Sequence, residues 1–374
     1  MDKKIKWSIK AADSIMQRLP HLYEDNGNNG KWSYDYGVIL KGFEKVYEQT
    51  GNHKYFSYIK ENIDYFIKDD GLIKGYDLED YNIDNINNGK MLFPLYKKTK
   101  MEKYKKAADL LFCQLQRHPR TSEGAFWHKK IYPYQIWLDG LYMGTPFYAE
   151  YQMTFGNCNL EDVIHQFRVS YTHLLDKNTG LLYHAWDEKK IQPWANKQTG
   201  LSPNFWGRSI GWYLMAIIDT IEIIPDQTPG RDFLIEIFVR SLKALLKYQD
   251  EQSGVWYQVT DKLNEKGNYL EASCSSMYVY SMAKGIRLGI LKSAEWKVQV
   301  IKSFNGLLNE FVLLTKEGWL NLNKCCQVAG LGGESQRDGS YAYYISEPII
   351  CNDQKGLGAF LQACAEYEEV VGEV

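Results

Sequence analysis

Apolar side chains occupy almost every position of Ile210-Gly211-Trp212-Tyr213-Leu214-Met215-Ala216-Ile217-Ile218. Their spacing at three and four residues predicts a helix, and a helix that is apolar nearly all round belongs in a protein interior. By contrast, Tyr104-Lys105-Lys106-Ala107-Ala108-Asp109-Leu110-Leu111 is polar and charged on one side. An amphipathic helix of that kind belongs at the surface. The chain is therefore expected to contain two kinds of helix, inner and outer.

The same periodicity recurs along the whole chain and pairs an outer with an inner helix. Long-range self-similarity of this kind is typical of helical-repeat or closed toroidal arrays. We therefore expect an all-α (α/α)6 barrel of about six inner and six outer helices, with an open solenoid as the competing architecture. The predicted helices lie near residues 7–19, 36–48, 53–67, 86–98, 101–117, 146–154, 160–175, 205–224, 231–250, 273–288, 294–314 and 354–368.

Glycine and turn residues cluster just before four inner helices, at 33–37, 84–89, 139–144 and 204–211. If the inner helices run parallel, these starts converge at one end of the barrel, where free N–H groups favour anionic ligands. The third start is open to two interpretations, because Thr145-Pro146 also fits an N-cap followed by a first-turn proline. Asp139 then lies either in the first helical turn or in the preceding loop, and at this end in both cases.

Composition narrows the class of protein. The 374 residues contain no segment of linker composition, so we expect a single domain over residues 1–374. A formal net charge of -2 without long runs of one sign gives no footprint for nucleic acid or a membrane surface. The seven cysteines are scattered and show no disulfide or zinc spacing. The start has no apolar signal segment, and no apolar stretch is long enough to cross a bilayer. We therefore expect a cytoplasmic protein. The longest non-helical stretch, near 321–351, is expected to be functional.

An aspartate stands among aromatic and glycine residues in Trp137-Leu138-Asp139-Gly140-Leu141-Tyr142-Met143-Gly144. An apolar setting favours the neutral acid form of a carboxyl, which can then act as a general acid. A second aspartate, Asp84, is predicted at the start of the preceding inner helix. If the two carboxyls are close, one stays ionised while the other is pushed toward the neutral form, as in glycoside chemistry. The alternative for both is a helix cap.

Other candidates combine basic groups with aromatic rings. Phe126-Trp127-His128-Lys129 and Leu182-Tyr183-His184-Ala185-Trp186 each place a histidine ahead of an inner helix, in a functional or a structural role. Asn204-Phe205-Trp206-Gly207-Arg208-Ser209-Ile210-Gly211-Trp212 joins one arginine to two tryptophans. Arginine binds carboxylates bidentately and tryptophan stacks on sugar rings, although Arg208 also fits a barrel salt bridge. The histidine spacing does not indicate a metal, and Gly330-Leu331-Gly332-Gly333 does not indicate a dinucleotide site.

Together these motifs resemble glycoside hydrolase family 105, the unsaturated rhamnogalacturonyl hydrolases. The resemblance runs from about residue 32 to the last helix. Its most specific parts are Trp137 to Met143 and the block Gly330-Leu331-Gly332-Gly333, Arg337-Asp338-Gly339-Ser340-Tyr341, Tyr343-Tyr344-Ile345-Ser346-Glu347-Pro348 and Asp353-Gln354-Lys355-Gly356. The fold of that family is an (α/α)6 barrel, which agrees with the periodicity.

The resemblance implies an uncommon hydrolysis. The substrate is a small oligosaccharide ending in a 4,5-unsaturated uronic acid, left by a polysaccharide lyase acting on pectin-type rhamnogalacturonan. Asp139 protonates carbon 4 and assists water addition at carbon 5, and Asp84 supplies a nearby negative charge. Matching positions suggest that the sugar site is lined by Tyr34, His128, His184, Trp206, Arg208 and Trp212. Either Arg208 or Lys129 meets the substrate carboxylate. No cofactor and no metal are implied, and a cytoplasmic enzyme would act on imported lyase products.

Several alternatives stay open. Asp35, in Tyr34-Asp35-Tyr36-Gly37, is acidic where a different polar side chain is expected in some relatives, which bears on the second sugar. An unsaturated glucuronyl hydrolase acting on glycosaminoglycan fragments would use the same fold and route. A sugar epimerase on an (α/α)6 barrel would use histidines for proton transfer. A helical scaffold or sugar-binding protein would bind without turnover. The sequence does not indicate the oligomeric state.

Overall fold

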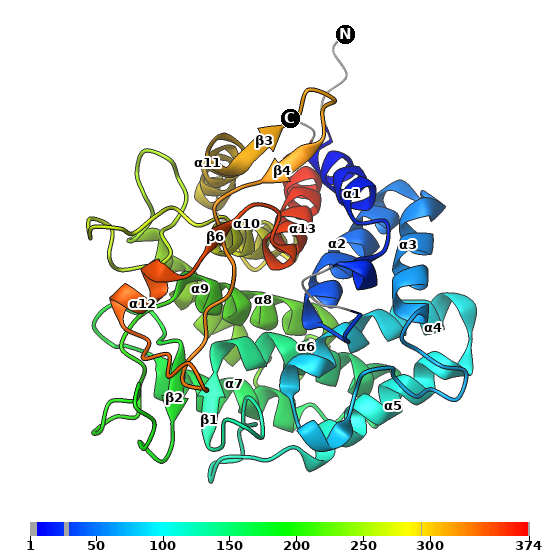
Figure 1. The fold of residues 1–374 in the computed structure, drawn as a ribbon, viewed down its shortest axis with the longest axis horizontal. Coiled ribbons are helices and arrows are strands. Elements are labelled where there is room, and N and C mark those ends of the chain that lie inside the picture. Colours follow the sequence, from blue (N-terminus) through cyan, green and yellow to red (C-terminus); the bar gives the residue numbers. More distant parts are fainter. Residues whose placement is uncertain (1–5, 26–29, 293, 373–374) are drawn as a thin grey trace.

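The inner helices form a closed ring in the computed structural model, which describes residues 6–25, 30–292 and 294–372. Each inner helix packs against the next, and the last packs against the first, so that α13 lies beside α2 (Figure 1). This closure confirms the barrel and excludes the open solenoid. In ring order the members are α2 (Tyr34–Thr50), the 3-10 segment η3 (Ile83–Met91) continued by α4 (Leu92–Thr99), α6 (Leu138–Thr154), α8 (Gly207–Ile223), α10 (Ala272–Arg287) and α13 (Gln354–Val371).

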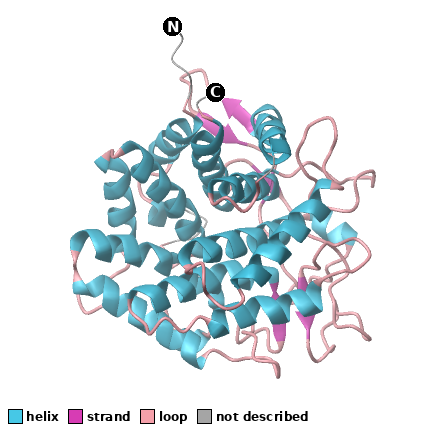
Figure 2. Ribbon diagram, turned by 180° about the vertical axis from the view of Figure 1, so that it is seen from behind, coloured by secondary structure: helices cyan, strands magenta, loops and turns pink. Residues whose placement is uncertain are grey.

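An outer helix accompanies each inner one. The outer set is α1 (Trp7–Arg18), α3 (His53–Asp64), α5 (Glu102–Arg117), α7 (Glu161–Leu174), α9 (Arg231–Leu246) and α11 (Ala294–Phe311). Shorter helices are η1 (Leu22–Glu24), η2 (Leu78–Asp80) and α12 (Tyr341–Ser346). The strands are short, as Figure 2 shows. Within the described residues they form three antiparallel pairs: β1 (Gln135–Trp137) with β2 (Ala185–Asp187), β3 (Val312–Leu314) with β4 (Leu320–Leu322), and β5 (Cys325–Cys326) with β6 (Ile349–Ile350).

Burial separates the two kinds of helix as the periodicity predicts. In α8 every residue from Gly207 to Ile221 is buried. In α5 the buried residues recur at three- and four-residue spacing along one face: Tyr104, Ala107, Ala108, Leu111, Gln114 and Leu115. Removing apolar surface from water is the main force that holds such a barrel together. The inner ring therefore forms the core, and the outer helices cover it with one apolar face each.

The start of α6 settles the question left by Pro146. The helix begins at Leu138, so Asp139 lies in its first turn and Pro146 lies inside the helix. The expected helix start at residue 146 is therefore wrong. A proline has no N–H for the carbonyl four residues earlier, which here belongs to Tyr142. The Nζ of Lys90, buried in the neighbouring η3, donates to that carbonyl oxygen over 3.4 Å.

The predicted helix over 86–98 is partly wrong in type. Residues 83–91 form a 3-10 segment, and only Leu92–Thr99 is α-helical. The side chains of Asn87 and Asn88 donate to the backbone oxygens of Tyr34 and Ser33, each over 2.8 Å. Asparagine competes for backbone hydrogen bonds in this way, which weakens a regular α-helix.

Three further predictions can be compared with the structure. The stretch near 321–351 contains the short helix α12 and strands β5 and β6, so it is not free of regular structure. All seven cysteines are free. Among the described residues, no helix has both the length and the apolar character that crossing a membrane requires. Residues 1–5, which begin the segment where no signal sequence is expected, lie outside the described ranges.

Candidate active site

The inner helices all begin at the same end of the barrel, which we call the mouth. Each start carries a charged side chain: Asp35, Asp84, Asp139, Arg208, Glu271 and Asp353. Contacts link neighbouring starts across the ring. The guanidinium of Arg208 lies 3.4 Å from Glu271 and 3.8 Å from Asp353, and Lys355 Nζ lies 3.8 Å from Asp35. The expected convergence of the helix starts is therefore present.

A short strand pair brings His184 to Asp139. Strand β1 leads directly into α6, and its Trp137 stands opposite Ala185 of β2. The backbone N–H of Leu138 donates to the carbonyl of His184 over 3.0 Å. As a result, His184 Nε2 lies 3.2 Å from Asp139 Oδ2, and Nδ1 of the same ring lies 2.7 Å from the Tyr344 hydroxyl. The Asp139 side chain keeps 14% of its surface exposed, so a ligand at the mouth can reach it.

Asp84 lies in a different electrostatic setting from Asp139. The segment that carries His128 and Lys129 bridges to Asn82, just before η3. It places Lys129 Nζ 2.6 Å from Asp84 Oδ2, and His128 Nε2 3.8 Å from Oδ1. Burial alone would raise the pKa of Asp84, but the Lys129 ammonium and His128 hold it below its ordinary value. Asp84 is therefore ionised at neutral pH.

His128 is a neutral side chain that lies between the two helix starts. Burial lowers the pKa of His128 to about 4, although the negative charge of Asp84 acts in the opposite direction. Its ring stacks on that of Trp137, with centroids 4.4 Å apart and planes 11° apart. Gly140, next to Asp139, allows this approach: a Cβ there would lie 3.2 Å from His128 Nδ1. His128 is thus a polar, uncharged group beside both carboxyls.

Tyr34 lies near Asp84, and Trp206 lies beside His184. Burial and the negative charges of Asp35 and Asp84 raise the pKa of Tyr34 well above its ordinary value, so its hydroxyl stays protonated. The ring of Trp206 lies 4.8 Å from that of His184. Trp212 is placed differently. It lies further along α8, fully buried, and stacks on Tyr142 of α6 with centroids 4.7 Å apart. Its visible role is packing between two inner helices.

Arg208 donates four hydrogen bonds to groups within the protein. Its guanidinium donates to the Ser273 hydroxyl over 2.7 Å, to the carbonyls of Gln327 and Cys326, and to Glu271 over 3.4 Å. Only 1% of the side chain is exposed. Burial alone would lower the pKa of Arg208, but Asp353 and Glu271 raise it well above its ordinary value. These contacts fit the barrel salt bridge that the sequence left open.

A loop between β5 and α12 lies beside the mouth and adds groups that the sequence did not single out. Leu331 is buried against Trp137 and Trp194. Arg337 donates to the Gly332 carbonyl over 3.0 Å and to the Tyr132 hydroxyl over 3.1 Å. Tyr344, the partner of His184, belongs to the same block of sequence. That block carries the family resemblance, but its sequence does not indicate a chemical role for Tyr344. Glu271, a single acidic residue, gave no signal in the sequence.

The mouth therefore combines an ionised carboxylate, a second carboxyl paired with a histidine, and walls of tryptophan and tyrosine. A closed helical barrel with such a site fits a glycoside hydrolase. The model of Glycosyl Hydrolase Family 88 matches residues 7–371, and the chain belongs to this family.

Relatives and solved structures agree with this assignment. A family 105 glycoside hydrolase from C. acetobutylicum ATCC 824 is 54% identical, with a TM-score of 0.94 over 98% of this chain and 100% of that one. The unsaturated rhamnogalacturonyl hydrolase YesR of Bacillus subtilis is 29% identical over 66% of this chain and 68% of its own length. The unsaturated glucuronyl hydrolase of Bacillus sp. GL1 shares the fold, with a TM-score of 0.70, 14% identity, and coverage of 98% of this chain and 96% of that one.

Proposed function

We propose that this enzyme hydrates the double bond of a 4,5-unsaturated uronic acid at the end of a small oligosaccharide. The unsaturated galacturonyl-rhamnose released from rhamnogalacturonan by a lyase is the substrate we expect. The observation that supports this most is the unequal pair of carboxyls: Asp84 is ion-paired with Lys129, whereas Asp139 faces His184. The match to YesR supports the choice of substrate.

In the proposed reaction, Asp139 donates its proton to carbon 4 of the vinyl ether. The oxocarbenium-like species that forms at carbon 5 is stabilised by the charge of Asp84. Water adds its oxygen to carbon 5 and gives its proton to the Asp139 carboxylate, which restores the acid. The hemiketal then opens to a ketone, the ring oxygen becomes a hydroxyl on carbon 1, and this hemiacetal expels the neighbouring sugar. The overall reaction consumes one water molecule and needs no cofactor.

We assign the substrate carboxylate to Lys129 rather than Arg208. The Lys129 side chain is 22% exposed and points from the mouth segment to Asp84, whereas Arg208 is enclosed by its acceptors. A partly exposed amine can turn toward a ligand, whereas the Arg208 guanidinium would have to break buried hydrogen bonds. Tyr34, His128, His184 and Trp206 would then contact the sugar, with Arg208 and Trp212 supporting them from behind.

The test is the ultraviolet absorbance of unsaturated disaccharides made by lyases from rhamnogalacturonan and from chondroitin. The conjugated double bond absorbs, and hydration removes that absorbance. Loss with the rhamnogalacturonan product alone is the expected result. Loss with the chondroitin product alone would keep the reaction and transfer the substrate to the glucuronyl class. Unchanged absorbance with both would contradict the proposed function.

A further inference from the structure

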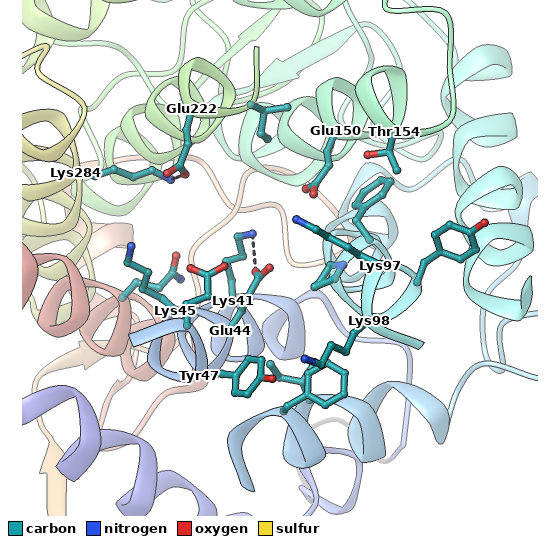
Figure 3. A pocket seen from close by; sticks show the side chains of 18 of the residues that line it. Lys41, Glu44, Lys45, Tyr47, Lys97, Lys98, Glu150, Thr154, Glu222 and Lys284 are labelled. Atoms are coloured by element: carbon teal, nitrogen blue, oxygen red, sulfur yellow. Dashed lines mark hydrogen bonds and ion pairs between the residues drawn. The ribbon is translucent and has the colours of Figure 1, made fainter. Parts of the chain in front are cut away.

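A large cavity lies at the end of the barrel opposite the mouth. It has a volume of about 720 Å³ and is lined largely by the C-terminal halves of the inner helices. Its wall includes Lys41 and Glu44 of α2, Lys97 of α4, Glu150 of α6, Glu222 of α8 and Lys284 of α10 (Figure 3). Glu366 of α13 also lines it. None of the groups assigned to the mouth lines it. Its volume is in the range of sites for small organic ligands.

The charges on one side of the cavity neutralise one another. Glu222 lies 2.6 Å from both Lys284 and Arg287, and Arg287 lies 2.6 Å from Glu366. Lys284 and Glu366 are almost completely buried. Buried charges that are paired and hydrogen-bonded in this way are part of the framework. The wall formed by α8, α10 and α13 is thus a polar surface whose charged groups are paired with one another.

The opposite side has charges without such compensation. Glu150 is half-buried, and burial raises its pKa to about 7. In Figure 3, Glu150 and Lys97 point toward each other across the cavity. Among the described residues, no ion pair within 4.0 Å is formed by Glu150, Lys97, Lys98 or Lys100. Aromatic rings complete this wall: Tyr47, Phe56, Phe93 and Tyr96.

Helix geometry alone explains only part of this arrangement. The negative ends of the helix dipoles favour basic side chains in last turns, and Lys97, Lys98, Lys284 and Arg287 all occupy such positions. The dipoles do not explain a half-buried carboxyl such as Glu150, nor the hollow between the walls. Seven basic and five acidic side chains line the cavity, so the excess charge favours an anion.

We propose that this cavity is a second binding site, for a small sugar acid of one or two rings. Its carboxylate would lie against Lys97 and Lys98. Its hydroxyls would bond Glu150, a carboxyl group that a plain inorganic anion would not need. Glu44 is already paired with Lys41 at 2.6 Å and would only border the ligand. One apolar ring face would pack on Tyr96, which is only half-buried, as sugars pack on aromatic side chains. The proposal does not depend on the reaction at the mouth.

Calorimetric titration of the full-length protein with D-galacturonate tests the proposal. We expect one binding event that Lys97→Gln/Lys98→Gln weakens by about tenfold or more, the effect of losing charge-assisted hydrogen bonds. Lys129→Gln removes the group assigned to the substrate carboxylate at the mouth. It should leave this event unchanged, which separates the event from any binding at the mouth. A matched control, Lys105→Gln/Lys106→Gln on the outer helix α5, should also leave it unchanged.

Two further ligands make the chemistry specific. D-galactose, with the same ring but no carboxylate, should bind this site at least about tenfold more weakly. Inorganic phosphate should also bind more weakly, because it cannot use the aromatic wall. Equal binding of phosphate would show a general anion site and overturn the proposal. An event that is absent in the wild type, or insensitive to the lysine substitutions, would overturn it as well.

Discussion

At the scale of single residues, the two carboxyls at the mouth differ because their neighbours differ. Asp84 has an ammonium group at 2.6 Å and is held ionised, whereas the nearest basic group to Asp139 is the imidazole of His184 at 3.2 Å. Two nearby carboxyls in different electrostatic settings can take different roles, one as the acid and one as its charged partner. This difference is the physical basis of the proposed roles.

Asp139→Asn should abolish turnover of the unsaturated disaccharide. The amide keeps the shape of the side chain but cannot donate the proton, so kcat should fall by at least about 100- to 10,000-fold. Binding of substrate and the circular dichroism spectrum should stay close to those of the wild type. Asp109→Asn on the outer helix α5 is the control and should keep full activity. A variant at 139 that retains most of its rate would contradict the role assigned to Asp139.

Arg208→Met tests whether this arginine is a framework group. The substitution leaves Glu271 buried without its cation, which should lower the free energy of unfolding by about 3–5 kcal/mol. Urea denaturation measures the loss, and adding Glu271→Gln should recover part of it by removing the uncompensated charge. Arg240→Met, in an exposed pair with Glu236, should change stability little. If Arg208→Met were as stable as the wild type but bound substrate poorly, a direct role at the sugar would be favoured instead.

At the scale of elements, η3 and α6 are joined by an unusual contact. Pro146 leaves the carbonyl of Tyr142 without its helical donor, and Lys90 of η3 supplies one from inside the barrel, with its Nζ 3.4 Å from the Tyr142 ring centroid. Asp84 and Asp139 lie at the starts of these same two elements. The contact therefore ties together the helices that carry both carboxyls.

Lys90→Met should change how stability depends on pH. Burial lowers the pKa of Lys90 to about 7, whereas an unfolded lysine titrates near about 10.4. Between these values only the unfolded chain holds the proton, so the free energy of unfolding rises with pH, by up to about 1.4 kcal/mol per unit. Lys90→Met should flatten this rise between about pH 7.5 and about pH 9 in urea titrations.

The exposed Lys106→Met is the control and should keep the wild-type slope. Burial raises the pKa of Glu150 to about 7. Between the pKa of an unfolded glutamate and about 7, only the folded state holds this proton, so Glu150 affects the pH dependence of stability below this window. An unchanged slope in Lys90→Met would mean that the lysine is charged in the folded protein at these pH values.

At the scale of the whole molecule, closing the ring brings the first and last inner helices together. Gly358 of α13 packs directly on the backbone of α2: a Cβ there would lie 2.7 Å from the carbonyl carbon of Val38 and 2.8 Å from the backbone N of Ile39. Backbone atoms on both sides cannot move as a side chain can. This glycine therefore sets how closely the two ends of the chain approach.

Gly358→Ala should lower the free energy of unfolding by about 1–3 kcal/mol, the usual cost of overpacking. Gly42→Ala is a matched control in the same interface, where the new Cβ meets the side chain of Leu361 at 2.8 Å, which can shift. Its loss should be smaller. Equal losses would mean that backbone contact is not what limits the closure. The single-domain organisation stays a prediction, and coincident urea transitions by circular dichroism and tryptophan fluorescence would support it.

The sequence by itself determined most of the helices, their inner and outer classes, the barrel, and the placement of Asp84 and Asp139 at one end of it. These features follow from apolar periodicity and turn residues, which report on neighbours within a few positions along the chain. The sequence did not determine the 3-10 form of residues 83–91 or the start of α6 at Leu138. Only the tertiary structure decided the partners: His184 for Asp139, Lys129 for Asp84, and Glu271 and Asp353 for Arg208. Ion pairing depends on which side chains the closed ring brings within a few ångströms and removes from water, and many of these partners lie far apart in the chain.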